Sequence, residues 1–348
     1  MLPCVTVLMT TYNGSRFIGA SIASILAQTF SDFELLIVDD GSTDDTIAAI
    51  ERHTDPRLRL IRMPANAGIA AARNTGFAAA TGTYIAALDH DDLAAPDRLA
   101  HQVAYLDAHP AVVLLGTEVS INDNGHLRTP DHPSSGDPLA IRWQLLIDNP
   151  LTWSSVMFRA QTVRALGTFM RTDYEPADDF DFYHRILAQG DIARLGETLT
   201  TYRYHSSNTS HAAAARLNHN AARVLEAAYT PWLQAEAAPA ALTVIRHLSD
   251  RHPASDRPTL RHIGETLIRL LEHFSQAQHL SAADHHRLAR IAGQSWWRCV
   301  RAAVRSGNPT FITEHAHAGP LAAAQPPPSL DVLESLAIGT ICRLTLRP

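Results

Sequence analysis

Three carboxylates crowd into the four residues that follow one short apolar run. Asp89, Asp91 and Asp92 come directly after residues 84–88, a run that is typical of a buried strand. Carboxylates this close repel one another unless a cation holds them together, and sites made of oxygen ligands suit Mg²⁺ or Mn²⁺. The spacing therefore predicts a divalent metal site at the end of a strand. In the alternative interpretation, Asp91 or Asp92 caps the helix that follows.

The elements that must position these carboxylates alternate along the first 90 residues. Apolar runs predict strands at 5–9, 33–38, 58–62 and 84–88, and helical spacing predicts helices at 16–27, from about 44, and at 70–80. Such alternation is typical of an α/β fold with a mostly parallel sheet flanked by helices, whose ligands bind beyond the carboxyl ends of the strands. The polar segments 10–13, 39–40 and 89–92 lie at those ends, so we expect them to meet at one edge of the sheet.

The pattern changes twice further along the chain. We expect helices at 99–106 and 180–188, strands at 112–116, 154–158 and 199–204, and a hairpin over 119–127. From residue 212 onward the chain is rich in alanine, arginine and histidine at helical spacing, without strand candidates. The expected domains are therefore an α/β domain over 1–211 and an α-helical extension over 212–348.

Composition excludes several classes of protein. The chain has 348 residues and a net charge of −6, which argues against broad nucleic-acid binding, and all of its 29 basic residues are arginine. Three scattered cysteines form neither a disulfide nor a metal pattern. No apolar run approaches the ~18 residues that span a bilayer, and no cleavable leader precedes the first strand. We expect a cytoplasmic protein, or one held peripherally at the inner face of a membrane.

The first strand–helix turn excludes two kinds of nucleotide site. Residues 10–14 lack the glycine spacing that lets a pyrophosphate approach in dinucleotide-binding folds. The chain also has no Gly-Lys-Ser/Thr of the Walker type.

Six motifs then follow one another in a recognisable order. They are VLMTTYN at 7–13, VDDGSTD at 38–44, NAG at 66–68 with ARNTG at 72–76, DHDD at 89–92, EPADDFD at 175–181 and YRYH at 202–205. Together they resemble glycosyltransferase family 2 over residues 3–210. The resemblance implies the GT-A fold and an inverting, nucleotide-sugar-dependent enzyme. The Gln-x-x-Arg-Trp signature of processive members is absent, which favours the addition of single sugars.

The resemblance assigns residues to a metal and to the donor. It implies Mn²⁺ or Mg²⁺ at Asp91, with Asp89 near the ribose or the metal. His205 would complete the metal or phosphate site, although a lone histidine is often a surface residue. Thr10, Tyr12, Asp40, Asn66, Gly68 and Arg73 fall in the donor-binding motifs.

Within the donor motifs, three side chains have specific expected roles. Tyr12 would lie against the nucleobase, and Asp40 would accept the imino hydrogen of uracil. Arg73 would pair with the diphosphate or with the aspartate cluster. The alternative for residues 39–42 is turn chemistry, with Asp39 structural and Asp40 functional.

The acceptor hydroxyl must lose a proton, and a carboxylate opposite the leaving group is the simplest base. Asp179 matches the second acid of the family's Glu-Asp motif, in which Asp178 replaces the glutamate. Both could instead be helix-start acids favoured by the helix dipole. Trp153 could stack on a sugar or belong to the core.

The expected activity is transfer of one sugar from a UDP-sugar to a glycan or lipid-linked acceptor in bacterial surface polysaccharide assembly. Two alternatives stay open, a catalytically silent nucleotide-sugar-binding relative and a sugar nucleotidyltransferase. Residues 10–14 lack the glycine-rich, basic loop expected of the latter. Residues 284–307 carry arginines among apolar residues, which predicts a helix that packs on the protein or lies on an anionic membrane.

Overall fold

The computed structural model describes residues 2–129, 136–205, 208 and 213–345. The chain forms two compact units. The first comprises Met1–Leu145 and Asn149–Ala221, and the second comprises Leu146–Asp148 and Ala222–Pro348. The domain assignment made from the sequence, 1–211 and 212–348, stays a prediction.

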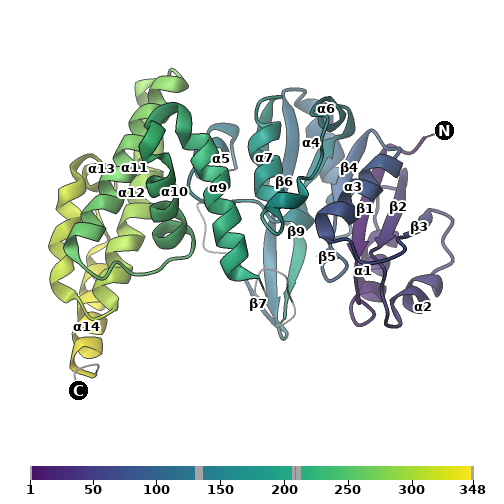
Figure 1. Ribbon diagram of the computed structural model, residues 1–348, viewed down its shortest axis with the longest axis horizontal. Helices are drawn as coiled ribbons and strands as arrows, with labels where there is room; N and C mark the ends of the chain where they lie inside the picture. The colour runs from purple at the N-terminus through teal and green to yellow at the C-terminus, as the bar shows by residue number, and fades with distance from the viewer. Residues whose placement is uncertain (1, 130–135, 206–207, 209–212, 346–348) are drawn as a thin grey trace. The chain divides into compact units, whose positions relative to one another are not determined.

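The first unit begins with a parallel α/β arrangement (Figure 1). Its strands β1 (Val5–Thr11), β2 (Phe33–Asp39), β3 (Leu58–Arg62) and β4 (Tyr84–Ala87) are connected by helices α1 (Ile18–Leu26), α2 (Thr46–Glu51) and α3 (Ile69–Ala79). The strands are all parallel and lie in the order β3-β2-β1-β4. The predicted α/β fold class is confirmed, and the carboxyl ends of these strands share one edge.

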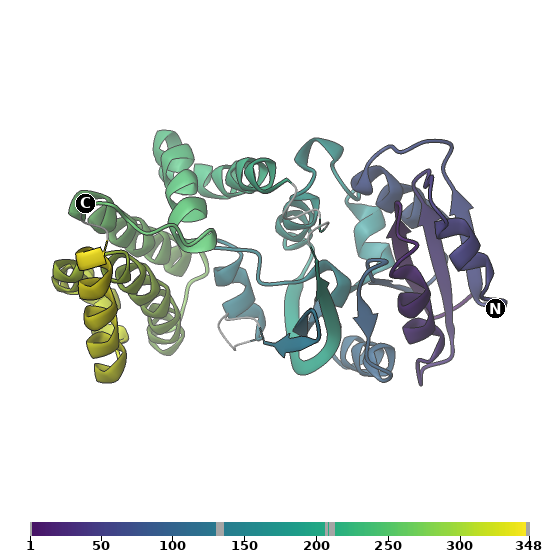
Figure 2. The same ribbon diagram turned by 90° about the horizontal axis from the view of Figure 1, so that it is seen from below.

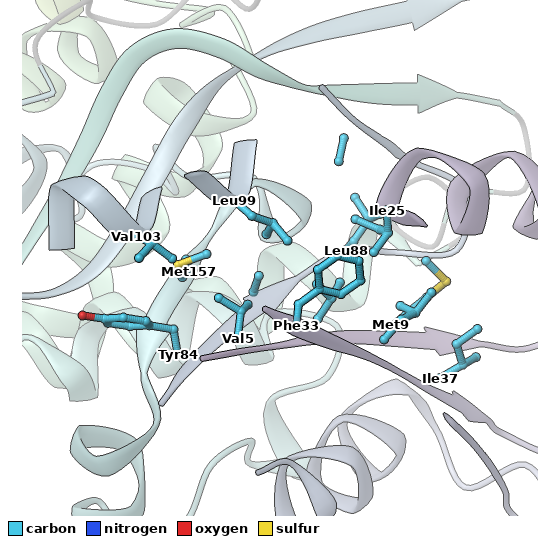
Figure 3. Packing of buried hydrophobic residues seen from close by; sticks show 14 of the residues in the cluster. Val5, Met9, Ile25, Phe33, Ile37, Tyr84, Leu88, Leu99, Val103 and Met157 are labelled. Atoms are coloured by element: carbon cyan, nitrogen blue, oxygen red, sulfur yellow. The ribbon is translucent and has the colours of Figure 1, made fainter. Parts of the chain in front are cut away.

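Alternate side chains of β1 pack against different helical layers, as the two-residue period of a strand requires. Val5 and Met9 belong to a core that also includes side chains of α1 and of α4 (Arg98–Ala108) (Figure 3). Leu8 points to the opposite face, toward α3. A Cβ atom on Gly76 of α3 would lie 2.2 Å from the Leu8 side chain, so glycine is required for this close approach.

The second half of the sheet is mixed. It contains β5 (Leu93–Ala94), β6 (Val112–Asp123), β7 (His126–Arg128), β8 (Met157–Arg159) and β9 (Asp191–Tyr204). Strand β8 joins β4 to β6 by antiparallel pairing, and β6 then pairs in parallel with β9. The predicted hairpin is present between β6 and β7. Asn124 and Gly125 both have positive φ, as a two-residue hairpin turn of type I′ requires.

Three predicted strands have different bounds. The strand predicted at 199–204 is the end of the longer β9, which begins at Asp191. Residues 112–123 form one strand, because irregular pairing near Glu118 lets β6 continue beyond Gly116. The predicted strand at 154–158 is wrong at its start, where Trp153–Ser155 is a 3₁₀ turn. There the Ser155 hydroxyl donates to the carbonyl oxygen of Thr152. This local hydrogen bond competes with pairing of the backbone to a neighbouring strand.

Short helices complete the first unit. They are α5 (Pro138–Gln144), α6 (Ala160–Ala165) and α7 (Asp178–Ile186), with a 3₁₀ turn at Thr172–Tyr174. Helix α7 corresponds to the helix predicted at 180–188, and it begins at the two adjacent aspartates of the EPADDFD motif.

The described part of the second unit is helical throughout (Figure 2). Its main elements are α9 (Ala214–Leu233, which starts in the first unit), α10 (Ala237–Val244), α11 (Arg257–Ala277), α12 (Ala282–Arg305), α13 (Gly319–Ala324) and α14 (Ser329–Thr345). Segments of 3₁₀ helix lie at Gln234–Glu236 and Pro309–Ala318, and a π-helical segment lies at Ile245–Ser249. Among the described residues, no helix is both long and apolar enough to cross a membrane.

Helix α12 contains the apolar and basic pattern noted at 284–307. Its apolar side chains, Trp296 and Trp297 included, are buried, and α12 packs against α11, α13 and α14. The Trp297 indole donates to Asp331 at 2.7 Å, and Arg305 also pairs with Asp331 at 2.9 Å. Packing within the helical unit therefore accounts for the apolar stripe.

Candidate active site

A cleft of about 780 Å³ lies in the first unit. Its walls include segments that directly follow β1, β2 and β4, where the sequence placed the ligand site. Twelve site residues named from the sequence line it, namely Thr10, Tyr12, Asp40, Asn66, Gly68, Arg73, Asp89, Asp91, Trp153, Asp178, Asp179 and His205. Asp92, the third carboxylate of the predicted metal site, is fully buried and is not in this lining. The structure thus brings the whole predicted set together, and the role of each residue stays a prediction.

The three carboxylates after β4 form a compact cluster. Asp89, Asp91 and Asp92 each place an oxygen within 4.8 Å of the others. Burial raises the pKa of Asp92 well above its usual range, and the neighbouring carboxylates of Asp91 and Asp89 raise it further. One buried oxygen of Asp92, Oδ2, has no hydrogen-bond partner among the described residues. A divalent cation would relieve both conditions, so the donor set fits Mn²⁺ or Mg²⁺.

Asp91 faces the cleft beside two polar side chains. His205 Nε2 lies 3.0 Å from its Oδ2, and the amide of Asn208 donates to the same oxygen at 3.3 Å. The backbone N–H of His205 in turn donates to Asn208 Oδ1 at 2.6 Å. Sequence reasoning missed Asn208, which lies just beyond the YRYH motif and gave no signal of its own.

Arg203 stabilises the segment that contains residues 90–92. Arg203 belongs to the YRYH motif, but nothing in the sequence indicated this role. Its backbone N–H donates to Asp92 at 2.9 Å, and its guanidinium donates to the Asp91 carbonyl. The same guanidinium reaches the Ser21 hydroxyl at 2.7 Å, while Ser21 donates to the carbonyl of His90 at 2.6 Å. Backbone and side-chain contacts therefore fix the 90–92 segment.

The two aspartates at the end of β2 make different contacts. Asp39 accepts from the backbone of Ser42 at 3.1 Å, which is turn chemistry. Asp40 lines the cleft and accepts from the backbone of Ala67 at 2.8 Å and of Gly68 at 3.0 Å. Asp40 therefore also anchors the loop before α3, a contact the sequence did not predict. Tyr12, at the rim, is 44% exposed and available to a planar ligand.

Arg73 is buried at the centre of the site. Its guanidinium donates to Asp178 at 2.8 Å and to Asp89 at 3.3 Å, and it lies 4.2 Å from the centre of the Trp153 ring. Burial alone would lower the pKa of Arg73, but the attraction of Asp178 and Asp89 outweighs burial and raises it. Of the two partners predicted for Arg73, the structure shows the aspartate cluster.

Asp179 has a different environment from its neighbour. It accepts from the side chain of Asn149 at 3.0 Å and from the backbone of Phe180 at 2.7 Å. Burial, and then the charge of Asp178, raise the pKa of Asp179 to about 7. A carboxyl group with such a pKa can exchange protons near neutral pH. Asn149 lies in a segment without a motif, so no sequence signal pointed to it.

Comparison with known proteins decides the family. A model described as glycosyl transferase family 2 matches residues 6–167. EpsE of Bacillus subtilis, a protein named as a glycosyltransferase, is 33% identical over 198 residues, which are 54% of this chain and 68% of EpsE. The chain belongs to glycosyltransferase family 2. The predicted membership is thereby confirmed.

Other glycosyltransferases of the family are similar to this chain over the same region. An uncharacterized glycosyltransferase of Haemophilus influenzae is 28% identical over 60% of this chain and 68% of its own length. The amylovoran biosynthesis glycosyltransferase AmsE of Erwinia amylovora is 28% identical over 57% of this chain and 75% of AmsE.

Solved structures share the GT-A fold of this glycosyltransferase. Residues 1–349 of S. aureus TarS, in complex with UDP-GlcNAc, match 99% of this chain and 92% of that one with a TM-score of 0.55 and 16% identity. A mannosyltransferase from Pyrobaculum calidifontis, in complex with GDP-Man and Mn²⁺, matches 99% of this chain and 88% of its own with a TM-score of 0.50 and 20% identity. At these identities the likeness establishes the fold alone.

Proposed function

We propose that this glycosyltransferase is a metal-dependent, inverting enzyme that moves one sugar from a UDP-sugar to a glycan or lipid-linked acceptor. The observation that carries the proposal is the position of Arg73. It bonds to Asp89 of the carboxylate cluster and to Asp178, the neighbour of the proposed base Asp179. One buried cation thus contacts both a carboxylate of the proposed metal site and the neighbour of the proposed base within a single cleft.

The proposed reaction follows from these groups. Asp179 takes the proton of the acceptor hydroxyl as that oxygen forms a bond to the anomeric carbon. The bond from this carbon to the diphosphate breaks on the opposite side, and its electron pair leaves with the nucleoside diphosphate, so the configuration inverts. When bound, a metal at Asp89, Asp91 and His205 would supply positive charge to the leaving group.

Donor recognition is assigned to the segments after β1 and β2. Tyr12 would lie against the uracil, and Asp40 keeps lone pairs to accept the imino hydrogen beyond the two backbone contacts it already makes. Thr10, Asn66 and Gly68 would line the donor site.

The names and bound ligands of related proteins support a nucleotide-sugar donor and the pathway. AmsE acts in amylovoran biosynthesis, TarS was solved with UDP-GlcNAc, and the archaeal mannosyltransferase was solved with GDP-Man and Mn²⁺. We therefore infer a role in bacterial surface polysaccharide assembly on the cytoplasmic side, where nucleotide-sugars would be the donors. Peripheral membrane contact stays a prediction.

A binding screen tests the donor and the metal together. Ligands that bind only the folded state raise the melting temperature, so UDP-, GDP- and dTDP-sugars are compared with and without Mn²⁺. We expect UDP-sugars with Mn²⁺ to give the largest shift. In Asp91→Ala the metal-dependent part should disappear, whereas Asp45→Ala, an exposed acid outside the cleft, should retain it.

Product analysis separates the alternative activities. Release of UDP and a glycosylated or hydrolysed sugar would support transfer, whereas pyrophosphate release would identify a nucleotidyltransferase. Binding with neither product would identify a silent relative. Metal-enhanced turnover by Asp91→Ala would contradict the metal assignment.

A further inference from the structure

The cleft has a strong excess of negative charge. Its described lining includes six carboxylates, those of Asp40, Asp89, Asp91, Glu175, Asp178 and Asp179. Only two arginines line it, and the chain has no lysine. Arg73 is already paired with Asp178 and Asp89. A nucleoside diphosphate brings further negative charge into this cleft. A cation of the lining that is not paired with a carboxylate is therefore a candidate to bind the diphosphate.

Arg16 is that cation. It lies in the turn before α1, is exposed, and forms no ion pair with a carboxylate among the described residues. Arg203 is also nearby, but hydrogen bonds to Ser21 and to the carbonyl of Phe17 hold its guanidinium. The Arg16 guanidinium lies over the ring of Phe17, 4.9 Å from the ring centroid.

The position of Phe17 places Arg16 on the metal side of the cleft. The Phe17 ring stacks on His205 with centroids 4.5 Å apart and an interplanar angle of 16°. His205 in turn lies 3.0 Å from Asp91, the proposed metal ligand. This sequence of contacts leads from Arg16 to the carboxylate cluster, where the diphosphate is expected.

We infer that Arg16 is a further catalytic residue that contacts the diphosphate of the donor and stabilises the departing nucleoside diphosphate. This inference rests on the proposed function. Arginine is suited to the task because its planar guanidinium stays charged and can bond to two phosphate oxygens at once. When bound, a metal at the carboxylate cluster would supply positive charge to the diphosphate, and Arg16 would supply further charge from the rim next to α1.

The test compares ligands that differ only in phosphate. Isothermal titration in Mn²⁺ measures the Kd of UDP and of uridine for the wild type, Arg16→Gln and Arg16→Lys. We expect Arg16→Gln to weaken UDP binding about 10–100-fold, the usual range for a lost hydrogen bond to a charged group, and to leave uridine binding unchanged. Arg16→Lys should recover part of the loss, because it keeps the charge without the bidentate geometry.

Arg52→Gln is the matched control, since it removes one exposed arginine outside the cleft. Its UDP affinity should stay within about twofold of the wild type, because an exposed charge that does not line the cleft is largely screened by water and salt. Melting temperatures of all variants verify that they are folded.

Three other outcomes would contradict the inference, and each has its own interpretation. An equal loss of UDP and uridine binding would assign Arg16 to the stacking of Phe17 and overturn a diphosphate contact. Unchanged UDP affinity with a raised KM for the acceptor would assign the cation to an anionic acceptor and equally overturn it. Absence of UDP binding by the folded wild type would overturn the proposed function, and this inference with it.

Discussion

Arg73 donates a 2.8 Å hydrogen bond to Asp178, and both side chains are almost fully buried. This ion pair gives the two adjacent acids of α7 different environments. Asp178 is held by a permanent cation, whereas Asp179 is bonded to the neutral amide of Asn149. A carboxylate in an ion pair is a weak proton acceptor, so the arrangement favours Asp179 as the base.

The Asp179→Asn variant should lose transfer but keep the donor. Asparagine retains the shape and the contact to Asn149 but cannot take a proton, so turnover should fall about 10²–10⁴-fold, the usual contribution of a positioned base. The Kd of UDP-sugar should change little. Turnover and donor titration are measured on the same preparation. Near wild-type turnover would move the base to Asp178 or Asp181 and leave Asp179 as a helix-start acid.

Activity and stability should respond to pH in opposite directions. Because the pKa of Asp179 is about 7, kcat/KM should rise with pH up to about 7 and then level off. The unfolded chain releases this proton near pH 4 whereas the folded state keeps it, so this group lowers the free energy of unfolding as pH rises from about 4 to about 7.

The Asp179→Asn variant provides the control for that pH dependence. It has no proton to release at this position, so its stability relative to the wild type should increase over the same pH window. Urea unfolding at pH 5 and pH 8 measures the difference. A wild-type kcat/KM that is flat between pH 5.5 and 8 would contradict a base with this pKa.

The sequence predicted those features that depend on local patterns. Apolar runs predicted β1 to β4 within a few residues, and the motifs contain eleven of the twelve site residues that line the cleft, Trp153 being the exception. These succeed because a parallel sheet puts the carboxyl ends of its strands at one edge, so side chains far apart in sequence converge without further information.

Contacts between side chains far apart in sequence could not be predicted in this way. The Arg73–Asp178 pair joins residues 105 positions apart, and nothing in either motif specifies the partner. Glu175 likewise caps the start of α3 by accepting from Ala70 at 3.2 Å, across another 105 positions. Such contacts depend on how the segment from Glu175 to the start of α7 approaches α3, which the hydrophobic pattern of neither helix reveals.

Arg73→Met should destabilise the first unit strongly. The substitution leaves Asp178 buried without its cation, and breaking a buried ion pair in this way costs about 3–5 kcal/mol. Arg142→Met removes one partner of the more exposed Arg142–Asp191 pair and should cost about 1 kcal/mol or less. Urea unfolding followed by tryptophan fluorescence compares them. Equal, small losses for both variants would show that Arg73 does not stabilise the buried acids.

Asp40→Ala should weaken donor binding and loosen one loop. The carboxylate already accepts two backbone N–H groups, from Ala67 and Gly68, so the substitution removes these bonds as well as the proposed acceptor for uracil. Each bond to a charged acceptor contributes about 1.5–3 kcal/mol, which predicts a lower melting temperature and at least a tenfold loss of UDP affinity. The loss should be largest for UDP and small for free pyrophosphate with Mn²⁺, because the base is the group affected.

Asp39→Ala, which removes only a turn contact to Ser42, is the comparison: it should lower stability while UDP binds nearly as before. If both variants lose UDP affinity equally, the segment matters for its shape alone and Asp40 does not recognise the base.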